Sequence, residues 1–359
     1  MNKNSIKIKQ ICALFICLLP LSKIVSAPAI IAKNYAEKIW FPPLVWFLFE
    51  LLFIGFVFVL DKIHGGKTFF DILSSEYSEN FAKAIYFFYG VFFLIKSFLP
   101  LIEHKALIET AFYEILPSTP IFYPLFLVTF YISLKGLKAL GRAAEFCLPL
   151  SWAGLITIMF LAVPSGNAEV LLPLFHGNKS GAISLLSTVS WFGDALYFLF
   201  FMGHFEKEKH SVLRVLSSYA IPAVFTLGFF ICFYAVFAFV AETQLIAVKE
   251  VGIFSVTLQN VGRFDYIAVF LIALASVLSV SFPIVTSVKM FERVFPAKNA
   301  FIPALVINIL LLAATYLFAQ KYQLIVEIYQ KYLYPLFIFV FILPLLGLKR
   351  RKNEKLQTS

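Results

Sequence analysis

The sequence predicts an all-α integral membrane protein with ten transmembrane helices, arranged as a five-plus-five inverted repeat in which helices 1 and 6 are broken. Three observations lead to this prediction. The 359 residues are 61% hydrophobic and only 14% charged, a composition outside the range of soluble domains. Ten apolar segments have the length that spans a bilayer, about 17–25 residues. Polar residues interrupt the first and the sixth of these segments.

The ten predicted spans follow one another over nearly the whole chain. They cover residues 8–32, 40–60, 81–101, 121–137, 146–163, 182–203, 217–241, 266–285, 300–318 and 332–348. We expect a single transmembrane domain over residues 1–359, with repeat halves at about 1–163 and 164–330 and a basic cytoplasmic tail at 349–359.

The Lys and Arg residues predict the orientation of these spans. An even number of spans places both ends of the chain on one side of the membrane. If that side is the cytoplasm, nineteen of the thirty Lys and Arg residues fall in cytoplasmic segments and eight in outer ones, with Lys23, Lys83 and Lys96 at or inside spans. Cytoplasmic segments of membrane proteins carry such an excess of positive charge. We therefore expect both termini to be cytoplasmic.

The first span is interrupted at its centre by Pro20, Ser22 and Lys23. A proline frees backbone groups, and a lysine at mid-depth costs about 3 kcal/mol. Secondary transporters bind substrates and ions at such broken helices. We therefore predict a ligand site at this break, with Ser26 as a further member. The alternative is an ordinary helix kinked at Pro20, with Lys23 reaching a partner along its stem.

Ionisable residues also lie in the next two spans. Glu50 is at the centre of the second span, where a carboxylate needs a polar partner. Lys96 is near the outer end of the third span, close to Pro100, and we expect it to extend to the membrane boundary. The third span is expected to end at Leu101, before a charged outer connection that begins at Glu103.

The sixth span is broken in its middle by the sequence SWFGD at residues 190–194. Because the two breaks are five spans apart, the two copies have opposite orientations, as an inverted repeat requires. An unwound segment exposes backbone groups only where a cavity or a ligand satisfies them. The predicted site residues of this break are Ser190, Trp191, Gly193 and Asp194.

The charges at membrane depth are Lys23, Glu50 and Asp194. We expect Lys23 to pair with Asp194 across the two breaks, or with Glu50. In one interpretation this places a fixed cation near a ligand carboxylate or forms a proton-linked switch. In the other, a buried ion pair only holds helices together. The sequence leaves both open.

Two further segments carry polar residues of interest. In the eighth span Ser276 and Ser279 bond back to their own helix or line the site with one face. The outer connection at 243–258, TQLIAVKEVGIFSVTL, has the apolar spacing of an amphipathic helix. Such a helix lies either in the membrane interface or against the helix bundle.

Several classes of function have no support in the sequence. The basic residues form no patch interleaved with aromatic residues, which excludes a nucleic-acid partner and leaves the lipid bilayer as the surroundings of the chain. The five histidines are scattered in loops and at span ends, so we expect no metal site. There is no Walker loop, GxGxxG sequence or Ser/His/Asp arrangement. We expect neither enzymatic activity nor a cofactor.

Five motifs between the spans occur in a distinctive order over almost the whole chain. They are GGKTFFDIL at 65–73, LPSTP at 116–120, GLKALGRAAE between the fourth and fifth spans at 136–145, LLPL at 171–174 followed by Gly177, and RFD at 263–265. In this order they resemble the motifs of the spore-germination permease family, the GerAB-type B subunits of nutrient germinant receptors. That family is similar to amino-acid permeases of the amino acid-polyamine-organocation superfamily.

The resemblance implies a LeuT-type fold with a site between helices 1, 3, 6 and 8. It also implies a receptor subunit in the inner membrane of an endospore, with an A-type membrane subunit and a C-type lipoprotein as partners. A small nutrient such as an amino acid would bind at broken helices 1 and 6 and trigger germination. The alternatives are an amino-acid permease that transports its substrate by alternating access, and a structural membrane subunit without a ligand.

The chain departs from this family pattern in its first break. Many family members have Gly-Ser there, whereas this sequence has Leu21 and Ser22, followed by Lys23. Without the glycine, bare backbone is less available to hold a ligand carboxylate. Lys23 either replaces that contact with a charge or occupies the site itself.

Overall fold

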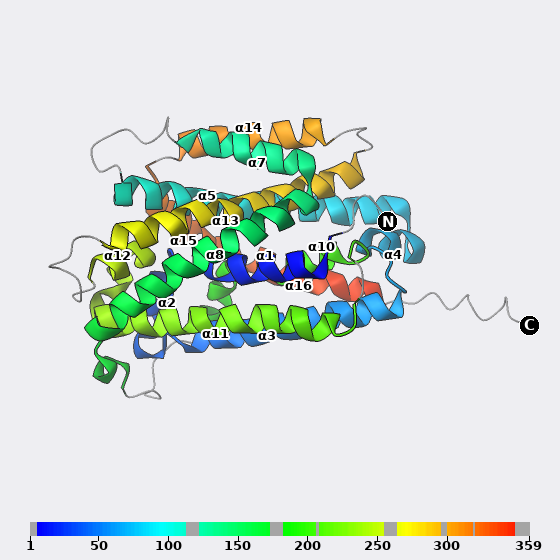
Figure 1. Cartoon of the computed structure of the whole chain (residues 1–359). Helices are drawn as coiled ribbons and strands as arrows, with labels where there is room; N and C mark the ends of the chain where they lie inside the picture. The colour runs from blue at the N-terminus through cyan, green and yellow to red at the C-terminus, as the bar shows by residue number, and fades with distance from the viewer. Residues whose placement is uncertain are drawn as a thin grey trace, which may run out of the picture.

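The computed structural model describes residues 6–112, 122–172, 182–205, 208–254, 264–295, 300–318 and 320–348, and it shows no named strand within them (Figure 1). The α-helices are α1 (Ile8–Leu21), α2 (Ala27–Tyr35), α3 (Phe41–Ile63), α4 (Phe69–Glu76), α5 (Glu79–Phe112), α7 (Pro124–Lys135), α8 (Leu137–Ala162), α9 (Ala182–Ser187), α10 (Leu196–Phe201), α11 (Ser211–Phe237), α12 (Ala247–Ile253), α13 (Phe264–Val294), α14 (Phe301–Leu317), α15 (Tyr322–Tyr332) and α16 (Tyr334–Ile342). Short 3-10 helices include η4 (Thr188–Trp191) and η7 (Leu343–Leu348). The predicted tail at 349–359 and the motif at 116–120 lie outside the described residues.

Each of the ten predicted spans coincides with one helix or with a short series of helices. The first is α1 with α2, the sixth is α9, η4 and α10, and the tenth is α16 with η7. Among the described residues, five helices are long and apolar enough to cross a membrane: α3, α5, α8, α11 and α13. The number rises to six if α14 and α15, which are bent by 115° relative to each other, form one broken span. The predicted breaks in spans one and six are confirmed. Length and composition alone therefore support five or six of the ten predicted crossings.

Two predicted boundaries are wrong. The third span does not end at Leu101, because α5 continues to Phe112 and buries Glu103 within it. The segment at 136–145 is not a connection, because α8 begins at Leu137. In both cases charged residues suggested a loop, since charges facing lipid are costly. In this structure the charged residues either lie in a part of the helix beyond its apolar segment or face other helices.

The bundle is organised around α5 and α13, which pack along each other at its centre (Figure 1). Helix α8 covers α13, and α1 lies between α8 and α11. Helices α7 and α14 lie side by side along one edge, where they form a second, smaller hydrophobic cluster with α5 and α13. The short helices of the two broken spans are therefore enclosed by long ones.

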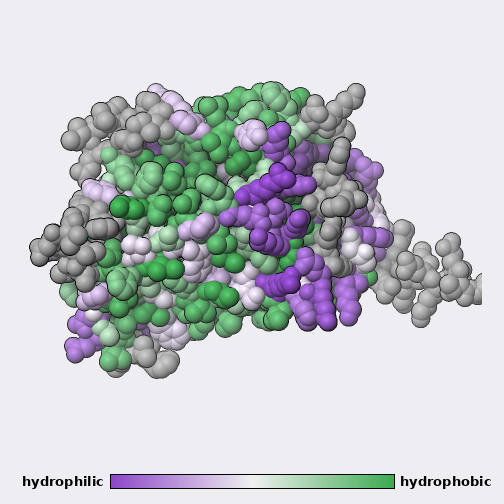
Figure 2. All heavy atoms as spheres, in the orientation of Figure 1, coloured by the Kyte–Doolittle hydropathy of each residue, from purple (hydrophilic) through white to green (hydrophobic). Residues whose placement is uncertain are grey.

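The outer surface has the distribution of apolar side chains that a lipid environment requires. Leu52, Phe160 and Val224 are 73%, 76% and 71% exposed. In Figure 2 hydrophobic side chains cover most of the bundle, and hydrophilic ones gather toward the end that carries α4. The first and last described segments lie at this end, because the Ile6 N–H donates to the His204 carbonyl and Gly347 lies against Phe69 of α4.

We predict that Gly154→Ala destabilises the protein, because α8 lies close against α13 there. A Cβ atom at Gly154 would lie 2.8 Å from the Ala268 carbonyl oxygen and 2.8 Å from the Ile272 side chain. Small residues permit such close helix contacts in membranes, and overpacking costs about 1–3 kcal/mol. Unfolding in detergent measures the loss. Gly55→Ala is the matched control, since it adds a Cβ in the interior of α3 with nothing within 4 Å; equal effects of the two substitutions would contradict the prediction.

Candidate functional site

The break in the first span follows from the proline at position 20. Pro20 lacks the N–H that would bond to the Ile16 carbonyl, and the indole N–H of Trp152 donates to that carbonyl instead, at 3.3 Å. The break ends where α2 begins at Ala27. Two of its carbonyl groups, on Ile24 and Val25, accept hydrogen bonds from the first backbone N–H groups of α12 at 3.1 and 2.9 Å.

Helix α12 settles the two possibilities for the outer amphipathic segment. Its residues Ala247, Val248 and Val251 are buried, and it packs on α13 and α8. It therefore lies against the bundle, as the second possibility predicts, and satisfies the backbone of the first break.

The break in the sixth span lies between η4 and α10 and needs a glycine. Gly193 has a φ of +114°, a conformation that residues with a Cβ rarely adopt. A Cβ there would also lie 3.2 Å from the Lys96 ammonium. The bare backbone of Gly193 thus lets a lysine of α5 reach the break.

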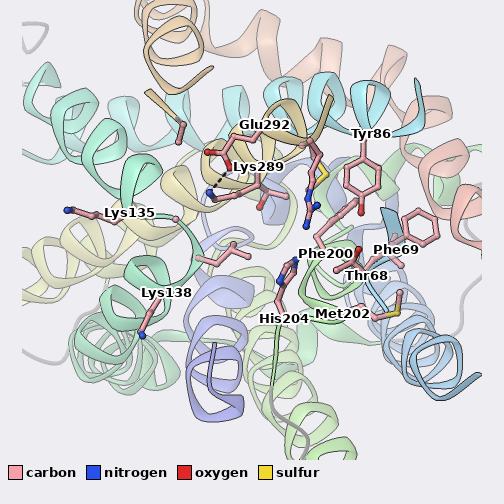
Figure 3. Close-up of a pocket in the computed structure, with 17 residues that line it drawn as sticks. Thr68, Phe69, Tyr86, Lys135, Lys138, Phe200, Met202, His204, Lys289 and Glu292 are labelled. Atoms are coloured by element: carbon pink, nitrogen blue, oxygen red, sulfur yellow. Dashed lines mark hydrogen bonds and ion pairs between the residues drawn. The ribbon is translucent and has the colours of Figure 1, made fainter. Parts of the chain in front are cut away.

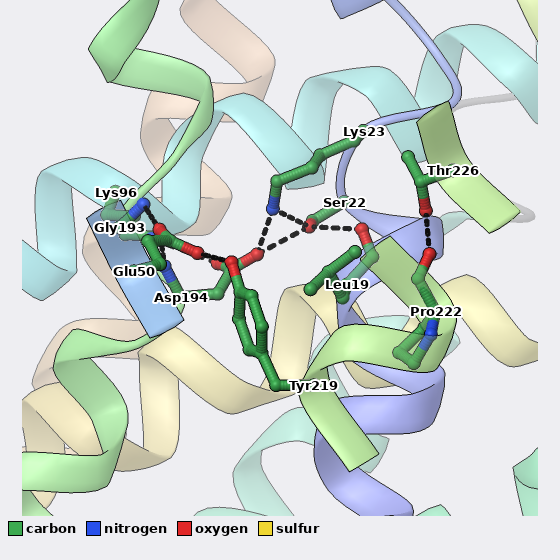
Figure 4. Close-up of polar contacts among 10 residues, drawn as sticks. All are labelled: Leu19, Ser22, Lys23, Glu50, Lys96, Gly193, Asp194, Tyr219, Pro222 and Thr226. Atoms are coloured by element: carbon green, nitrogen blue, oxygen red, sulfur yellow. Dashed lines mark hydrogen bonds and ion pairs between the residues drawn. The ribbon is translucent and has the colours of Figure 1, made fainter. Parts of the chain in front are cut away.

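The two breaks meet at a buried ion cluster on Asp194 (Figure 4). The ammonium of Lys23 forms a direct ion pair with one carboxylate oxygen, and Lys96 lies 3.1 Å from the other. The Ser22 hydroxyl donates to Asp194 at 2.9 Å and lies 3.2 Å from the Lys23 ammonium. The predicted pairing of Lys23 with Asp194 is therefore confirmed. We call Lys23, Glu50, Lys96 and Asp194 the central cluster.

Glu50 supports the other side of the same break. It accepts hydrogen bonds from the backbone N–H groups of Gly193 and Asp194, the latter at 2.8 Å, and from the hydroxyl of Tyr219 on α11 (Figure 4). A helix end without partners in a membrane costs several kcal/mol per group, so Glu50 supplies the acceptor that the broken helix lacks.

The central cluster holds two lysines, both paired with Asp194, and a second carboxylate, Glu50, in a closed site. Lys23 and Glu50 are 0% exposed, Asp194 is 1% exposed and Lys96 is 8% exposed. Aromatic rings adjoin both ammonium groups, with Lys23 5.4 Å from the Phe192 ring centroid and Lys96 5.0 Å from that of Tyr197. A polar ligand can enter only by replacing one of these pairings.

A second set of hydrogen bonds joins both breaks to α5. The backbone N–H and the hydroxyl of Ser26 both donate to Glu103, and the indole N–H of Trp191 donates to the Ser26 hydroxyl at 3.0 Å. Movement of either broken helix would therefore disturb the other.

We predict that Trp191 and Ser26 are energetically coupled. Trp191→Phe removes the indole donor but keeps an aromatic ring, and a neutral hydrogen bond contributes about 0.5–1.5 kcal/mol. A double-mutant cycle of Trp191→Phe with Ser26→Ala, measured by unfolding in detergent, is expected to give a coupling of that size. Additive effects of the two substitutions would show that the bond does not join the breaks.

The remaining predicted residues are placed as follows. Pro20 is buried at the end of α1, and the Ser190 hydroxyl bonds back to the Ser187 carbonyl at 3.2 Å. Ser276 bonds back to its own helix and lies 2.5 Å from the buried His104 ring. The Ser279 hydroxyl bonds back to the Ser276 carbonyl. The Pro20 carbonyl accepts a hydrogen bond from the backbone N–H of Lys23 at 3.0 Å. The three serine hydroxyls make no hydrogen bond to the central cluster among the described contacts.

Sequence reasoning missed several members of this polar interior. The interpretation of Lys96 as a cation at the membrane boundary is wrong, because it is buried against Asp194. Glu103 and His104, assigned to an outer loop, are buried in α5, and Tyr219 carried no signal. The spacing of Lys96 and Glu103, seven residues or about two helical turns, was a signal that one face of α5 points into the bundle.

The fold and family of the chain follow from comparison with known proteins. Residues 5–323 match the family described as spore germination protein. Among solved structures, "Crystal structure of MhsT in complex with L-phenylalanine" matches with a TM-score of 0.67 and 16% identity over 94% of this chain and 88% of that one. No curated protein matches. The likeness to MhsT confirms the LeuT-type fold, and the family match covers nearly the whole chain: the protein belongs to the spore germination protein family.

Proposed function

We propose that the protein is the nutrient-sensing subunit of a spore germinant receptor and binds an amino acid at the broken helices. Its partners in this role are an A-type membrane subunit and a C-type lipoprotein. It acts in the inner membrane of the endospore, with both termini on the cytoplasmic side, and it acts by binding and not by catalysis. Membership of the spore germination protein family supports the process.

The central cluster is the observation that carries the proposal of an amino-acid ligand. Both breaks present charges of opposite sign, Asp194 from the sixth span and Lys23 from the first, with Lys96 beside them. A zwitterion can exchange with this pair: its ammonium replaces that of Lys23 at Asp194, and its carboxylate then meets the released Lys23. The complex of MhsT with L-phenylalanine supports this class of ligand.

In this proposal the ligand acts by shifting a population. In the closed state described here, the pairing of Lys23 with Asp194 links the two broken helices. A ligand that binds only the open state stabilises that state by its full differential affinity. Opening separates the breaks, moves α10 and α2 relative to α5, and provides the signal to the partner subunits.

Germination of spores that carry single substitutions tests the proposal. Lys23→Met is expected to change the concentration of amino acid that gives half-maximal germination at least about tenfold. The substitution removes the ammonium group that exchanges partners with the ligand, and this interaction is worth about 1.4 kcal/mol or more. Lys33→Met, an exposed lysine of α2, is the matched control and is expected to leave that concentration unchanged. If Lys23→Met and the control behave alike with every amino acid tested, the site assignment is wrong.

The second candidate function is transport of the amino acid by alternating access. Two broken helices in a LeuT-type fold fit this function equally well. Uptake of radiolabelled amino acids into vesicles that contain the purified chain distinguishes the two. Saturable uptake that is lost in Asp194→Asn would establish a permease, whereas binding without uptake supports the sensor.

A further inference from the structure

A second group of charged side chains surrounds a cavity of about 420 Å³ at the end of the bundle that carries α4 (Figure 3). Its charged lining residues come from α7, α8, the segment after α10, and α13. We call it the basic cavity. The charged and titratable residues that line it are Lys135, Lys138, His204, Lys289, Glu292 and Arg293.

Positive charge exceeds negative charge in the basic cavity. Its one described carboxylate, Glu292, is held by Lys289 at 2.6 Å. Within the described residues, Lys135, Lys138 and Arg293 have no carboxylate at ion-pair distance; Arg293 lies over the Phe70 ring and Lys135 over that of Tyr131. The cavity therefore contains positively charged side chains that are available to bind an anion.

His204 lies in the field of these cations. Burial lowers the pKa of its imidazole below the usual value, and the charges of Arg293 and Lys289 lower it further. Asp71 on α4 acts in the opposite direction, and its carboxylate accepts a hydrogen bond from the Thr68 hydroxyl at 2.6 Å. The imidazole is thus neutral at neutral pH and free to donate one N–H bond.

The backbone at the α7–α8 junction passes close to one of these cations. Gly136 has a φ of +72° and a Cβ there would lie 2.9 Å from the Lys289 side chain, so the bare backbone leaves room for the lysine stem. In Figure 3 Lys289 and His204 lie on facing sides of the cavity, and Lys135 and Lys138 stand at its rim. Aromatic side chains, including Tyr86 and Phe200, form an apolar wall.

We propose that the basic cavity binds a phosphate-bearing organic anion, with its phosphate against Lys289, Arg293 and His204 and its organic part against Tyr86 and Phe200. Arginine and lysine together suit a phosphate, which offers several strong acceptors to donors from different elements. The cavity volume of about 420 Å³ is larger than the volume of a bare phosphate, so it leaves room for the organic part of the anion. This site does not depend on the proposed amino-acid site.

Two sources can supply this chemistry. Basic pockets between transmembrane helices on the cytoplasmic side bind anionic headgroups, and all four cations of the cavity belong to segments whose charge predicts a cytoplasmic position. The headgroup of an anionic phospholipid is one source. A free phosphomonoester in the cytoplasm is the other.

Binding to the purified full-length chain tests the proposal with one probe for each source. The free probe is glycerol 3-phosphate, followed by calorimetry in detergent. The lipid probe is phosphatidylglycerol, followed as its retention by the protein in native mass spectrometry after incubation with phosphatidylcholine vesicles that contain it. Lys289→Gln combined with Arg293→Gln is expected to weaken binding of the recognised probe at least about tenfold, since two charge-assisted contacts are lost.

The control keeps the same charge change at the same end of the bundle. Lys62→Gln combined with Lys67→Gln removes two exposed lysines that do not line the cavity and is expected to leave binding unchanged. Lys138 is an exposed lysine at the rim, and Lys138→Gln is expected to weaken binding to a smaller degree. This variant provides a second test if the double variant misfolds. Binding of glycerol 3-phosphate alone identifies a free ligand, and selective retention of phosphatidylglycerol identifies a headgroup. If neither probe binds, or if control and cavity variants lose binding equally, the proposal is overturned.

Discussion

Replacing Asp194 by asparagine is expected to lower the free energy of unfolding by about 3–5 kcal/mol, the loss measured when one partner of a buried ion pair is removed. Asparagine has nearly the same shape, so packing is preserved. It leaves Lys23 and Lys96 without the carboxylate that both now contact. Unfolding in detergent measures the loss, and spores carrying the variant are expected not to germinate with the amino acid.

The shared position of Asp194 also predicts an order among the variants. Lys23→Met leaves Asp194 paired with Lys96, so it is expected to cost less than Asp194→Asn. Asp71→Asn is the matched control, since this aspartate is exposed on α4 and an exposed charge contributes about 1 kcal/mol at most. The triple variant Lys23→Met, Lys96→Met, Asp194→Leu is expected to regain most of the stability, because apolar groups replace a complete buried cluster. A cost of Asp194→Asn no larger than that of the control would contradict the closed cluster.

The fold could be predicted because a bilayer imposes simple constraints on sequence. Spans must have a minimum length and must be apolar, so the ten segments were visible without a structure. The breaks were visible for the same reason, since Pro20 with Lys23, and Gly193 with Asp194, are costly inside a lipid-facing helix. The sequence left Lys23 two partners of opposite charge, Asp194 and Glu50, and the structure pairs it with Asp194.

The rest of the site could not be predicted, because the cost of a charge does not reveal which way its helix faces. Lys96 and Glu103 lie toward the end of an apolar segment, where the membrane boundary and the bundle interior both satisfy a charge. Only the packing of α5 against the broken helices decides between them. Tyr219 could not be predicted as a member of the site, because an aromatic residue in an apolar span is usually a core residue. The folding of the chain brings its hydroxyl to Glu50.

Replacing Glu50 by leucine is expected to cost about 3–9 kcal/mol. The substitution leaves the backbone N–H groups of Gly193 and Asp194 and the hydroxyl of Tyr219 without an acceptor, and each buried unsatisfied donor costs about 1–3 kcal/mol. Unfolding in detergent gives the total. Hydrogen exchange of the backbone at 192–196 is expected to become faster, because the break loses its anchor to α3.

Glutamine at position 50 separates the hydrogen bonds from the charge. Its carbonyl oxygen can still accept from the two backbone N–H groups, whereas its amide cannot accept from Tyr219. Glu50→Gln is therefore expected to cost about as much as Tyr219→Phe, about 1 kcal/mol, and far less than Glu50→Leu. If glutamine and leucine cost the same, the negative charge matters more than the acceptor, and Glu50 belongs with Asp194 as a counter-ion of the lysines. If glutamine is tolerated, α3 stabilises the broken sixth span by hydrogen bonding, and the break persists without any ligand. The pairing of Lys23 with Asp194 is then the interaction that an amino acid exchanges.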